Sequence, residues 1–295
     1  MSKLLNFYSI IFLHFAPRLR GAAIHSEQSG NHKTHIDKLP MYSYKNPEEW
    51  KVYNSNCNGQ RQSPVNILSA NMALIETANP LTWKGYREQP LNMSLENNGH
   101  AVEIKVQWEH NPPYITGGAA GDSVYVFDSM HFHWAHHDEV GSEHTVNNYS
   151  FPIEMHLVHH NNRYQSFEEA RENFDGLLVV AFFYELNEES NYALDSLREG
   201  LKAITETGSH VNIKPFPLER FHLEFHDKYT AYLGSLTTPP CQESVLWILA
   251  SEPLSLTRKQ IELFRTIHLS NKDDHNNRPT QPLNNRRIFY FSDTE

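Results

Sequence analysis

Residues 130–134 read Met130-His131-Phe132-His133-Trp134, and this short run predicts the local structure around it. On a β-strand, side chains alternate between the two faces, so His131 and His133 point the same way while Phe132 points the other. On a helix, side chains two residues apart diverge, and the apolar setting favours a strand. The run predicts a strand that presents two imidazoles to one metal ion, although a pair of buried, hydrogen-bonded histidines has the same pattern.

A second apolar strand follows at residues 152–159, which read Pro-Ile-Glu-Met-His-Leu-Val-His. Its alternation puts Glu154, His156 and Val158 on one face. A histidine with a carboxylate two residues away suits a metal ligand and the acceptor of its remaining ring N–H. Three imidazoles give a tetrahedral zinc site with one open position, which is the catalytic rather than the structural arrangement.

Short alternating or apolar runs separated by turn residues make up most of the chain from residue 41 onward. The expected strands include residues 101–108, 124–133, 153–159, 177–184 and 245–250. Helical patterns are few, and they fall at residues 166–174, 192–204 and 257–267. Many strands with a few helices predict one α+β, mainly β domain over residues 41–295, with a large sheet and short peripheral helices. A doubly wound nucleotide fold is not expected, because no glycine-rich phosphate loop occurs.

The composition excludes several classes of function. The chain has 295 residues, with 25 Lys and Arg against 35 Asp and Glu and a formal net charge of −10, whereas nucleic acids and anionic membranes call for a basic face. Hydrophobic residues make up 39% of the chain, enough for a packed core, and the mean hydropathy of −0.59 excludes a polytopic membrane protein. With 19 histidines and only two cysteines, a bound transition metal is expected to be held by imidazole.

The N-terminus and the sequons indicate a secretory route. Residues 1–23 have the positive start, apolar centre and small-residue end of a signal peptide. The alternatives are an apolar N-terminal tail or a short membrane-associating segment, and residues 24–40 read as a flexible leader. Asn92 and Asn148 begin Asn-x-Ser sequons, the first of them in a strand-like context where glycosylation is less favoured. No apolar tail for a lipid anchor is evident. Taken alone, Cys57 and Cys241 permit one disulfide or two free thiols.

Four further segments carry a resemblance to a known family. They are residues 60–67 (Gln-Arg-Gln-Ser-Pro-Val-Asn-Ile), 97–101 (Asn-Asn-Gly-His-Ala), 141–146 (Gly-Ser-Glu-His-Thr-Val) and 234–240 (Gly-Ser-Leu-Thr-Thr-Pro-Pro). In this order and spacing, the chain from about residue 42 to 291 resembles an α-class carbonic anhydrase, in particular its secreted members. The resemblance implies a twisted, mostly antiparallel central sheet and a disulfide between Cys57 and Cys241.

The resemblance also implies the chemistry. His131, His133 and His156 would hold Zn²⁺, and a zinc-bound hydroxide would convert CO₂ reversibly to bicarbonate and a proton. Thr237 would accept a hydrogen bond from that hydroxide and donate its own proton to Glu143, since a carboxylate only accepts.

Further residues receive supporting roles by the same resemblance. Thr238 would contact bicarbonate or an anionic inhibitor, and His100 would carry the proton to solvent, because imidazole exchanges protons near neutral pH. The residues expected to order the water chain are Tyr44, Asn98 and Glu103. Those expected to form the apolar wall that accepts CO₂ are Val158, Val179, Leu236, Val245 and Trp247, which the pattern alone reads as ordinary core residues.

Two positions depart from the family pattern. Ser129 stands two residues before His131, where the family commonly has Gln as the acceptor for that histidine, so we expect lower zinc affinity or rate. Glu103 occupies a position that is often neutral, and its charge is expected to raise the pKa of His100.

Three classes of function fit parts of this pattern. An active zinc enzyme accounts for all of it, with weak esterase activity and with sulfonamides and anions as inhibitors. A carbonic-anhydrase-like binding module without zinc is the alternative, although such relatives usually lack one of the three histidines that this chain keeps. A metalloprotease is disfavoured, because the chain has no His-Glu-x-x-His motif.

Overall fold

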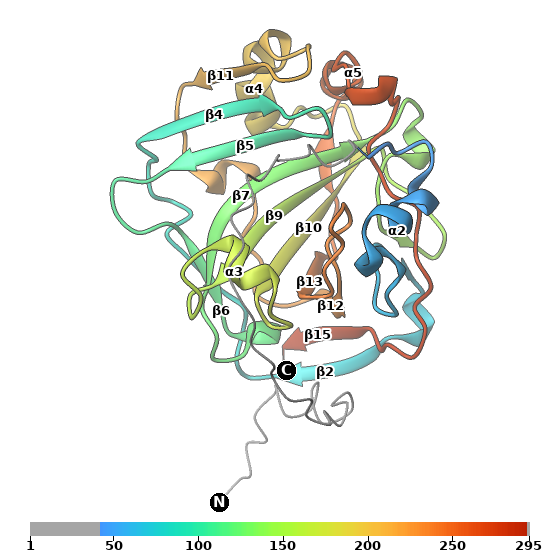
Figure 1. Cartoon of the computed structure of the whole chain (residues 1–295). Coiled ribbons are helices and arrows are strands. Elements are labelled where there is room, and N and C mark those ends of the chain that lie inside the picture. The colour runs from blue at the N-terminus through green and yellow to red at the C-terminus, as the bar shows by residue number, and fades with distance from the viewer. Residues whose placement is uncertain (1–41, 294–295) are drawn as a thin grey trace, which may run out of the picture. The chain divides into compact units, whose positions relative to one another are not determined.

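A thirteen-stranded sheet forms the centre of the fold in the computed structural model, which describes residues 42–293 (Figure 1). The strands along its main path are, in spatial order, β11 (His210–Ile213), β4 (Asn92–Asn97), β5 (Val102–Gln107), β7 (Tyr125–Trp134), β9 (Ile153–Asn161), β10 (Leu177–Leu186), β13 (Val245–Ala250), β12 (Tyr229–Gly234), β15 (Phe289–Asp293) and β2 (Ala73–Thr77). Off this path, β14 (Leu254–Leu256) pairs with β10, β6 (Tyr114–Thr116) with β7, and β3 (Thr82–Lys84) with β6. The expected signal peptide (1–23) and leader (24–40) lie outside the described residues.

Most neighbouring strands of this sheet run antiparallel, as the resemblance implies. β9 is antiparallel to both β7 and β10, whereas β10–β13, β10–β14 and β15–β2 are parallel pairs. The β7–β9 register sets His131 directly opposite His156. A separate parallel pair, β1 (Asn66–Ile67) with β8 (Thr145–Val146), lies beside the segment that carries Glu143.

The middle strands of the sheet are buried along most of their length. Every residue of β13 is buried, and so is the stretch 177–184 of β10. Continuous apolar runs of this kind are typical of strands that are covered on both faces. The expected strands at 177–184 and 245–250 are confirmed, and their lack of alternation follows from this double burial.

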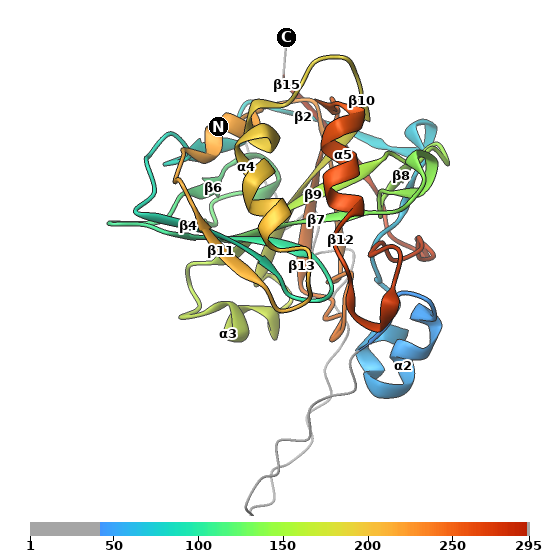
Figure 2. The ribbon, with the colours of Figure 1, turned by 90° about the horizontal axis from the view of Figure 1, so that it is seen from above.

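The longer helices begin where capping side chains occur in the sequence. Asn191 accepts hydrogen bonds from two backbone N–H groups at the start of α4 (Tyr192–Ala203), and Thr257 forms a capping box with Gln260 at α5 (Arg258–Arg265). α4 and α5 pack against each other (Figure 2), and α3 (Phe167–Arg171) starts after Ser166. All three expected helices are confirmed; α4 and α5 are one and three residues shorter than predicted, whereas α3 has five residues against nine predicted.

The other helices between residues 42 and 293 are a turn or little more. They are η1 (Pro47–Glu49), α2 (Trp50–Tyr53), η2 (Ser55–Asn58), η3 (Ser69–Asn71), η4 (Gly118–Ala120), η5 (Asp138–Val140), η6 (Leu218–Phe221) and η7 (Ser270–Lys272). Among the described helices, none has both the length and the apolar character that a bilayer crossing needs.

A disulfide joins Cys57 in η2 to Cys241 in the loop between β12 and β13, which confirms the expected pairing. Tyr44 and Trp50 pack around the bridge in a small hydrophobic cluster. The bridge therefore anchors the N-terminal part of the described chain to the loop that carries Thr237.

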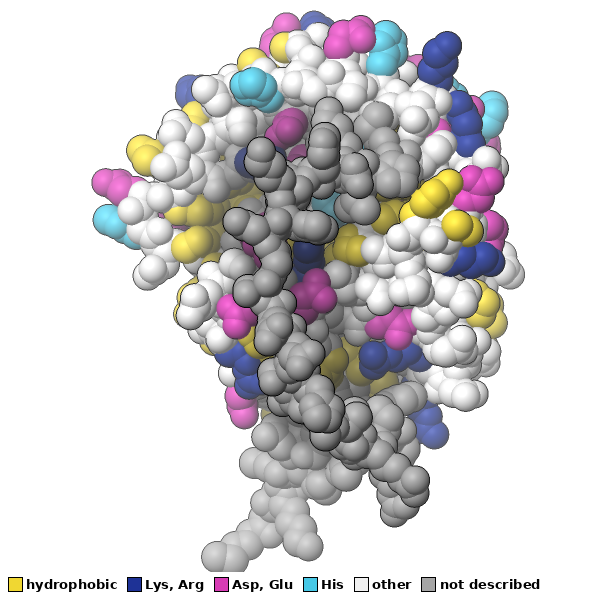
Figure 3. All heavy atoms as spheres, viewed as in Figure 1, with side chains coloured by type: hydrophobic (Ala, Val, Ile, Leu, Met, Phe, Trp, Pro, Cys, Tyr) yellow, Lys and Arg dark blue, Asp and Glu magenta, His cyan; other side chains and the backbone are white. Residues whose placement is uncertain are grey.

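Charged groups of both signs are interspersed on the face seen in Figure 3. One of the more extended ion-pair arrangements joins η5 to α5. There Asp138 accepts from Arg258 at 2.6 Å and from Arg265 at 2.7 Å.

Candidate metal centre

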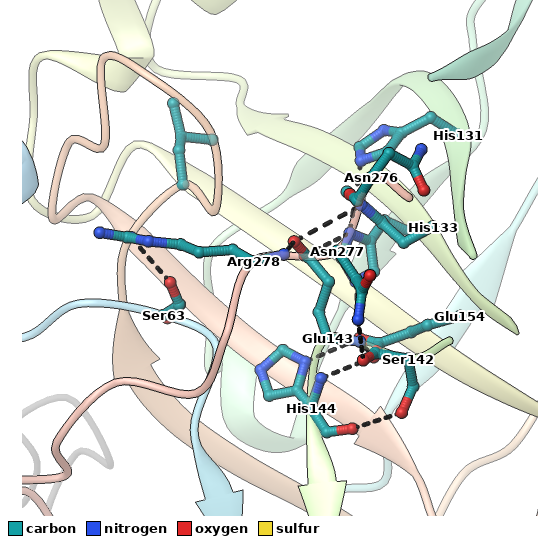
Figure 4. Close-up of polar contacts among 12 residues, drawn as sticks. Ser63, His131, His133, Ser142, Glu143, His144, Glu154, Asn276, Asn277 and Arg278 are labelled. Carbon is teal, nitrogen blue, oxygen red and sulfur yellow. Dashed lines mark hydrogen bonds and ion pairs between the residues drawn. The ribbon is translucent and has the colours of Figure 1, made fainter. Parts of the chain in front are cut away.

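Three imidazoles from β7 and β9 converge on one side of the sheet; Figure 4 labels two of them, His131 and His133. One ring nitrogen from each of His131, His133 and His156 lies within 4.8 Å of the other two. His156 Nδ1 and His131 Nε2 are 3.3 Å apart, and two nitrogens of a tetrahedral zinc site with bonds of 2.0–2.1 Å are separated by about 3.3–3.4 Å. The spacing of this pair fits zinc without rearrangement.

The outer ring nitrogens determine which nitrogen carries the proton. His133 Nδ1 is 2.7 Å from the carbonyl oxygen of Asn276, and His156 Nε2 is 2.6 Å from Glu154 Oε1. Because a carbonyl and a carboxylate only accept, both outer nitrogens donate, and the inner nitrogens of these neutral rings carry lone pairs. The inner nitrogen of His133, Nε2, is buried and has no hydrogen-bond partner among the described residues. Such an arrangement suits a cation.

Burial also favours the form of these rings that binds metal. It lowers the pKa of His133 to about 3 and lowers the pKa of His156. Burial, reinforced by the two neighbouring imidazoles, lowers the pKa of His131 well below its ordinary value. All three rings are therefore neutral at physiological pH, which is the state in which imidazole binds a metal.

Glu154 ties the candidate ligand His156 to the segment that carries Glu143; Figure 4 labels Glu154 together with Glu143 and His144. Its Oε2 accepts the backbone N–H groups of Glu143 at 2.9 Å and of His144 at 2.8 Å, and its Oε1 accepts from His144 Nδ1 at 2.7 Å and from His156 Nε2. Burial acts to raise the pKa of this carboxyl, but His144 and His156 lower it below its usual range. Glu154 is thus an ionised acceptor held by four donors. The second possible ligand group, His144 with Glu154 and His156, is already hydrogen-bonded within itself.

Glu143 is buried beside the three rings. Its Oε1 accepts the backbone N–H of Arg278 at 2.9 Å and lies 3.5 Å from His133 Nδ1. Burial and Glu154 raise the pKa of this carboxyl, while the Arg278 N–H and the hydroxyl of Thr237 act to lower it. A divalent cation at the three rings would also lower it. Glu143 and Thr237, expected as partners, lie close enough to interact.

His100 lies in the turn between β4 and β5. Gly99 has a φ of +90°, which glycine adopts without steric cost. Asn98 Oδ1 accepts the backbone N–H groups of His100 at 2.9 Å and of Ala101 at 2.8 Å. The imidazole stacks on Tyr42, with ring centroids 3.9 Å apart and planes at 11°. Asn98 therefore shapes the turn that positions His100.

The pKa of His100 is lowered, whereas the charge of Glu103 led us to expect a raised value. Partial burial lowers the pKa of His100, and Asp273 offsets this only in part. The Glu103 carboxylate lies 3.6 Å from Lys105 Nζ. Glu103 sits opposite His131 in the β5–β7 register, and Tyr44 lies with its ring centroid 6.4 Å from that of His100.

The expected apolar wall borders His156. Val179 pairs with Val158 on one side and with Trp247 on the other, and the Trp247 ring centroid is 4.8 Å from that of His156. Val245 belongs to the same buried cluster, and Leu236 packs against it. The five expected residues thus form one continuous apolar surface. Thr238 lies in the following turn, where its carbonyl accepts the Cys241 N–H at 2.9 Å.

His131 lacks an acceptor like those of the other two rings. Ser129, two residues before it on β7, is buried and interacts with Asp128 instead. Within the described chain, the contact with His156 is the one side-chain hydrogen bond of the His131 ring. The lower zinc affinity or rate expected from Ser129 stays a prediction.

The sequence gives no signal for two residues that complete the site. Asn276 and Arg278 act on His133 and Glu143 through backbone groups, for which side-chain type carries no information. The Asn276 side chain also accepts from Trp134 N at 2.7 Å and donates to Phe132 O at 2.8 Å, so it holds the end of β7.

The two sequons lie in different settings. Asn92 is exposed at the first position of β4 and donates to Gln107 Oε1 at 3.0 Å. Asn148 is exposed in a loop, with a φ of +64°.

Comparison with known proteins identifies the family. The model of the eukaryotic-type carbonic anhydrase family matches residues 45–292, and the chain belongs to this family. The chain is 36% identical over 249 residues to carbonic anhydrase 7 of Homo sapiens, covering 82% of this chain and 92% of that protein. It is 35% identical over 249 residues to carbonic anhydrase 7 of Mus musculus, with the same coverage of 82% and 92%. It is 35% identical over 245 residues to carbonic anhydrase 6 of Homo sapiens, covering 81% of this chain and 78% of that protein. The protein is therefore an enzyme, a carbonic anhydrase, of a family that hydrates CO₂ and generally uses zinc.

Proposed function

We propose that this chain binds Zn²⁺ through His131, His133 and His156 and uses it to interconvert CO₂ and bicarbonate. The observation that carries the proposal is the set of three converging ring nitrogens, two of which have their lone pairs fixed inward by outer hydrogen bonds. When bound, zinc supplies a Lewis acid that lowers the pKa of water and makes it a nucleophile near neutral pH. No observation on residues 42–293 favours the non-catalytic binding module.

Thr237 and Glu143 orient the attacking water. A carboxylate only accepts, so Glu143 fixes the direction in which the Thr237 hydroxyl donates, and the Thr237 oxygen is left to accept from the water. Arg278 N–H holds Glu143 Oε1 at 2.9 Å and so keeps the carboxylate in place. Thr238 is the proposed contact for bicarbonate and for anionic or sulfonamide inhibitors.

CO₂ lies against the apolar surface formed by Val158, Val179, Leu236, Val245 and Trp247. CO₂ is uncharged and only a weak hydrogen-bond acceptor, so an apolar surface without water favours its binding. This surface contacts His156 through the ring of Trp247. The same site would hydrolyse activated esters slowly.

His100 transfers the proton to solvent. Its lowered pKa makes it a weaker base than free imidazole, so it releases the proton readily at neutral pH. Tyr44, Asn98 and Glu103 are the proposed neighbours of the water chain, and Asn98 contributes by fixing the turn.

The chain is proposed to be secreted. Disulfides persist in oxidising compartments, and Cys57–Cys241 is such a bridge. Of the two sequons, the loop residue Asn148 is the proposed glycosylation site rather than Asn92 on β4. Loss of a glycosidase-sensitive mass shift in Asn148→Gln, but not in Asn92→Gln, tests this assignment.

Metal analysis combined with a stopped-flow CO₂ hydration assay tests the proposed chemistry. We expect one zinc per chain in the wild-type protein, and loss of both zinc and activity in His133→Ala. His136→Ala is the matched control, because His136 is an exposed histidine just beyond the end of β7. A wild-type protein that is folded, free of metal and inactive would overturn the proposal.

A further inference from the structure

The side chain of Tyr42 contacts two residues that the proposed chemistry uses in different steps. Its ring stacks on the imidazole of His100, with centroids 3.9 Å apart and planes at 11°. Its hydroxyl lies close enough to interact with the hydroxyls of Tyr44 and Thr238. Tyr42 therefore lies between the proposed proton carrier and the proposed contact for bicarbonate.

Neighbouring rings and backbone contacts hold Tyr42 in place. The ring packs edge-on against those of Tyr44 and Trp50, with centroids 5.6 Å and 5.2 Å away, beside the hydrophobic cluster around the disulfide. The carbonyl oxygen of Tyr42 accepts from Asn271 Nδ2 at 2.9 Å, and Asp273 accepts the backbone N–H of Tyr44 at 2.9 Å. Because the ring is held on several sides, little conformational entropy remains to be lost when its hydroxyl forms a hydrogen bond.

The hydroxyl of Tyr42 keeps its proton at physiological pH. Burial raises the pKa of this phenol well above its ordinary value, and the carboxylates of Glu143 and Asp273 add to the increase. The hydroxyls of Tyr44 and Thr238 act to lower the pKa without offsetting the effect of burial. A neutral phenol donates one hydrogen bond. Tyr42 is therefore a donor held beside Thr238.

A bound anion determines the direction of the interaction between Tyr42 and Thr238. The charged oxygen of bicarbonate only accepts, so Thr238 has to donate its single proton to it. The oxygen of Thr238 then has lone pairs free, and the neighbouring Tyr42 hydroxyl can donate to one of them. A hydroxyl that accepts a hydrogen bond is polarised by it and donates more strongly in turn.

We infer that Tyr42 is a positioning residue for bicarbonate: its hydroxyl donates to Thr238 and directs the Thr238 proton toward the bound anion. This inference rests on the proposed contact between Thr238 and bicarbonate, and it names the residue that sets the geometry of that contact. The substitution Tyr42→Phe keeps the ring that stacks on His100 and packs against Tyr44 and Trp50, so it removes the hydroxyl alone.

Bicarbonate binding to the cobalt-substituted protein tests the inference without relying on turnover. Cobalt has a visible absorption that responds to its ligands, whereas zinc is a d¹⁰ ion and has none. In Tyr42→Phe the Kd for bicarbonate should rise about three- to tenfold, which corresponds to the loss of one neutral hydrogen bond. Tyr53→Phe is the matched control and should leave the Kd unchanged, because Tyr53 is 60% exposed on α2.

Substitutions of Thr238 show whether Tyr42 acts through it. Thr238→Val should weaken bicarbonate binding at least as much as Tyr42→Phe, whereas Thr238→Ser, which keeps the hydroxyl, should bind nearly as the wild type does. In the Thr238→Val protein, the further change Tyr42→Phe should alter the Kd by less than about twofold. A Tyr42→Phe protein that binds bicarbonate like the wild type, or an equal loss with and without Thr238→Val, would overturn the inference.

The same titrations separate this inference from the proposed function. A folded wild-type protein that takes up cobalt but binds no bicarbonate would contradict the proposed function and the inference with it. Bicarbonate binding that depends on Thr238 but not on Tyr42 would contradict the inference alone.

Discussion

Removal of the disulfide, by replacing Cys57 and Cys241 together with alanine, is expected to lower the free energy of unfolding substantially. The two cysteines are 184 residues apart, and closure of a loop of this length is worth about 5 kcal/mol in the chain-entropy treatment. For a domain of this size, each kcal/mol shifts Tm by about 2–4 °C, so a decrease on the order of 10–20 °C is expected. Both positions are buried, and alanine avoids placing a new polar group there.

The same bridge should matter for activity before the fold is lost. Cys241 N–H donates to Thr238 O at 2.9 Å, and Leu236 N–H donates to Gln242 O at 3.0 Å, so the bridge and the Thr237 loop share one hydrogen-bonded segment. During titration with a reductant, CO₂ hydration should fall while circular dichroism still reports native structure. The double alanine variant is the control, because reductant should leave it unchanged. Coincident loss of activity and structure, or a Tm within 2 °C of wild type in the variant, would refute this reasoning.

Three further predictions concern the site and its surroundings. Ser129→Gln should tighten zinc binding about 10–100-fold by giving His131 an acceptor; competition with a chromophoric chelator measures this, and equal affinities would contradict it. His100→Ala should slow turnover by about 100-fold or more and be rescued by imidazole buffer in stopped-flow assays, whereas rates independent of buffer would count against a shuttle. Burial acts to raise the pKa of the Asp138 carboxyl, but Arg265 and Arg258 together lower it below its ordinary value of 3.8. The carboxylate therefore stabilises the folded protein above pH 3.8. This stabilisation is lost as the pH falls through the lower pKa that Asp138 has in the folded protein. Asp138→Asn should therefore cost about 1 kcal/mol in urea unfolding at pH 7 and little in strong acid, and an equal cost at both would be evidence against it.

The alternation along the strands predicted correctly which side chains share a face, but it did not predict which residues of neighbouring strands lie opposite one another. Alternation places His131 and His133 on one face of a strand, and does the same for Glu154 and His156. It carries no information about the register that sets His131 opposite His156. That register depends on pairing between β7 and β9, and hence on the whole sheet.

Contacts between distant segments set the other limits of prediction. The carbonyl that accepts from His133 belongs to Asn276, 143 residues away in the sequence. Every residue has a backbone carbonyl, so the residue type at position 276 does not predict this contact. The pKa of His100 is lowered although Glu103 was expected to raise it, because burial outweighs the nearby negative charge and Lys105 accompanies Glu103 on the same strand. Local patterns thus predict strands and helices, whereas the pKa of a side chain depends on burial and on distant charges that only the folded chain brings together.

The four bonds of Glu154 have an evolutionary consequence. A substitution of Glu154 removes its hydrogen bonds to His156 and to the backbone of Glu143 at once. Natural selection therefore cannot change metal affinity and the orientation of the attacking water independently at this position. Ser129, by contrast, stands two residues before His131 on β7 and interacts with Asp128, so it can vary without disturbing Glu143 or His156. Among related sequences, changes that alter metal affinity should therefore occur at the position of Ser129 more often than at the position of Glu154.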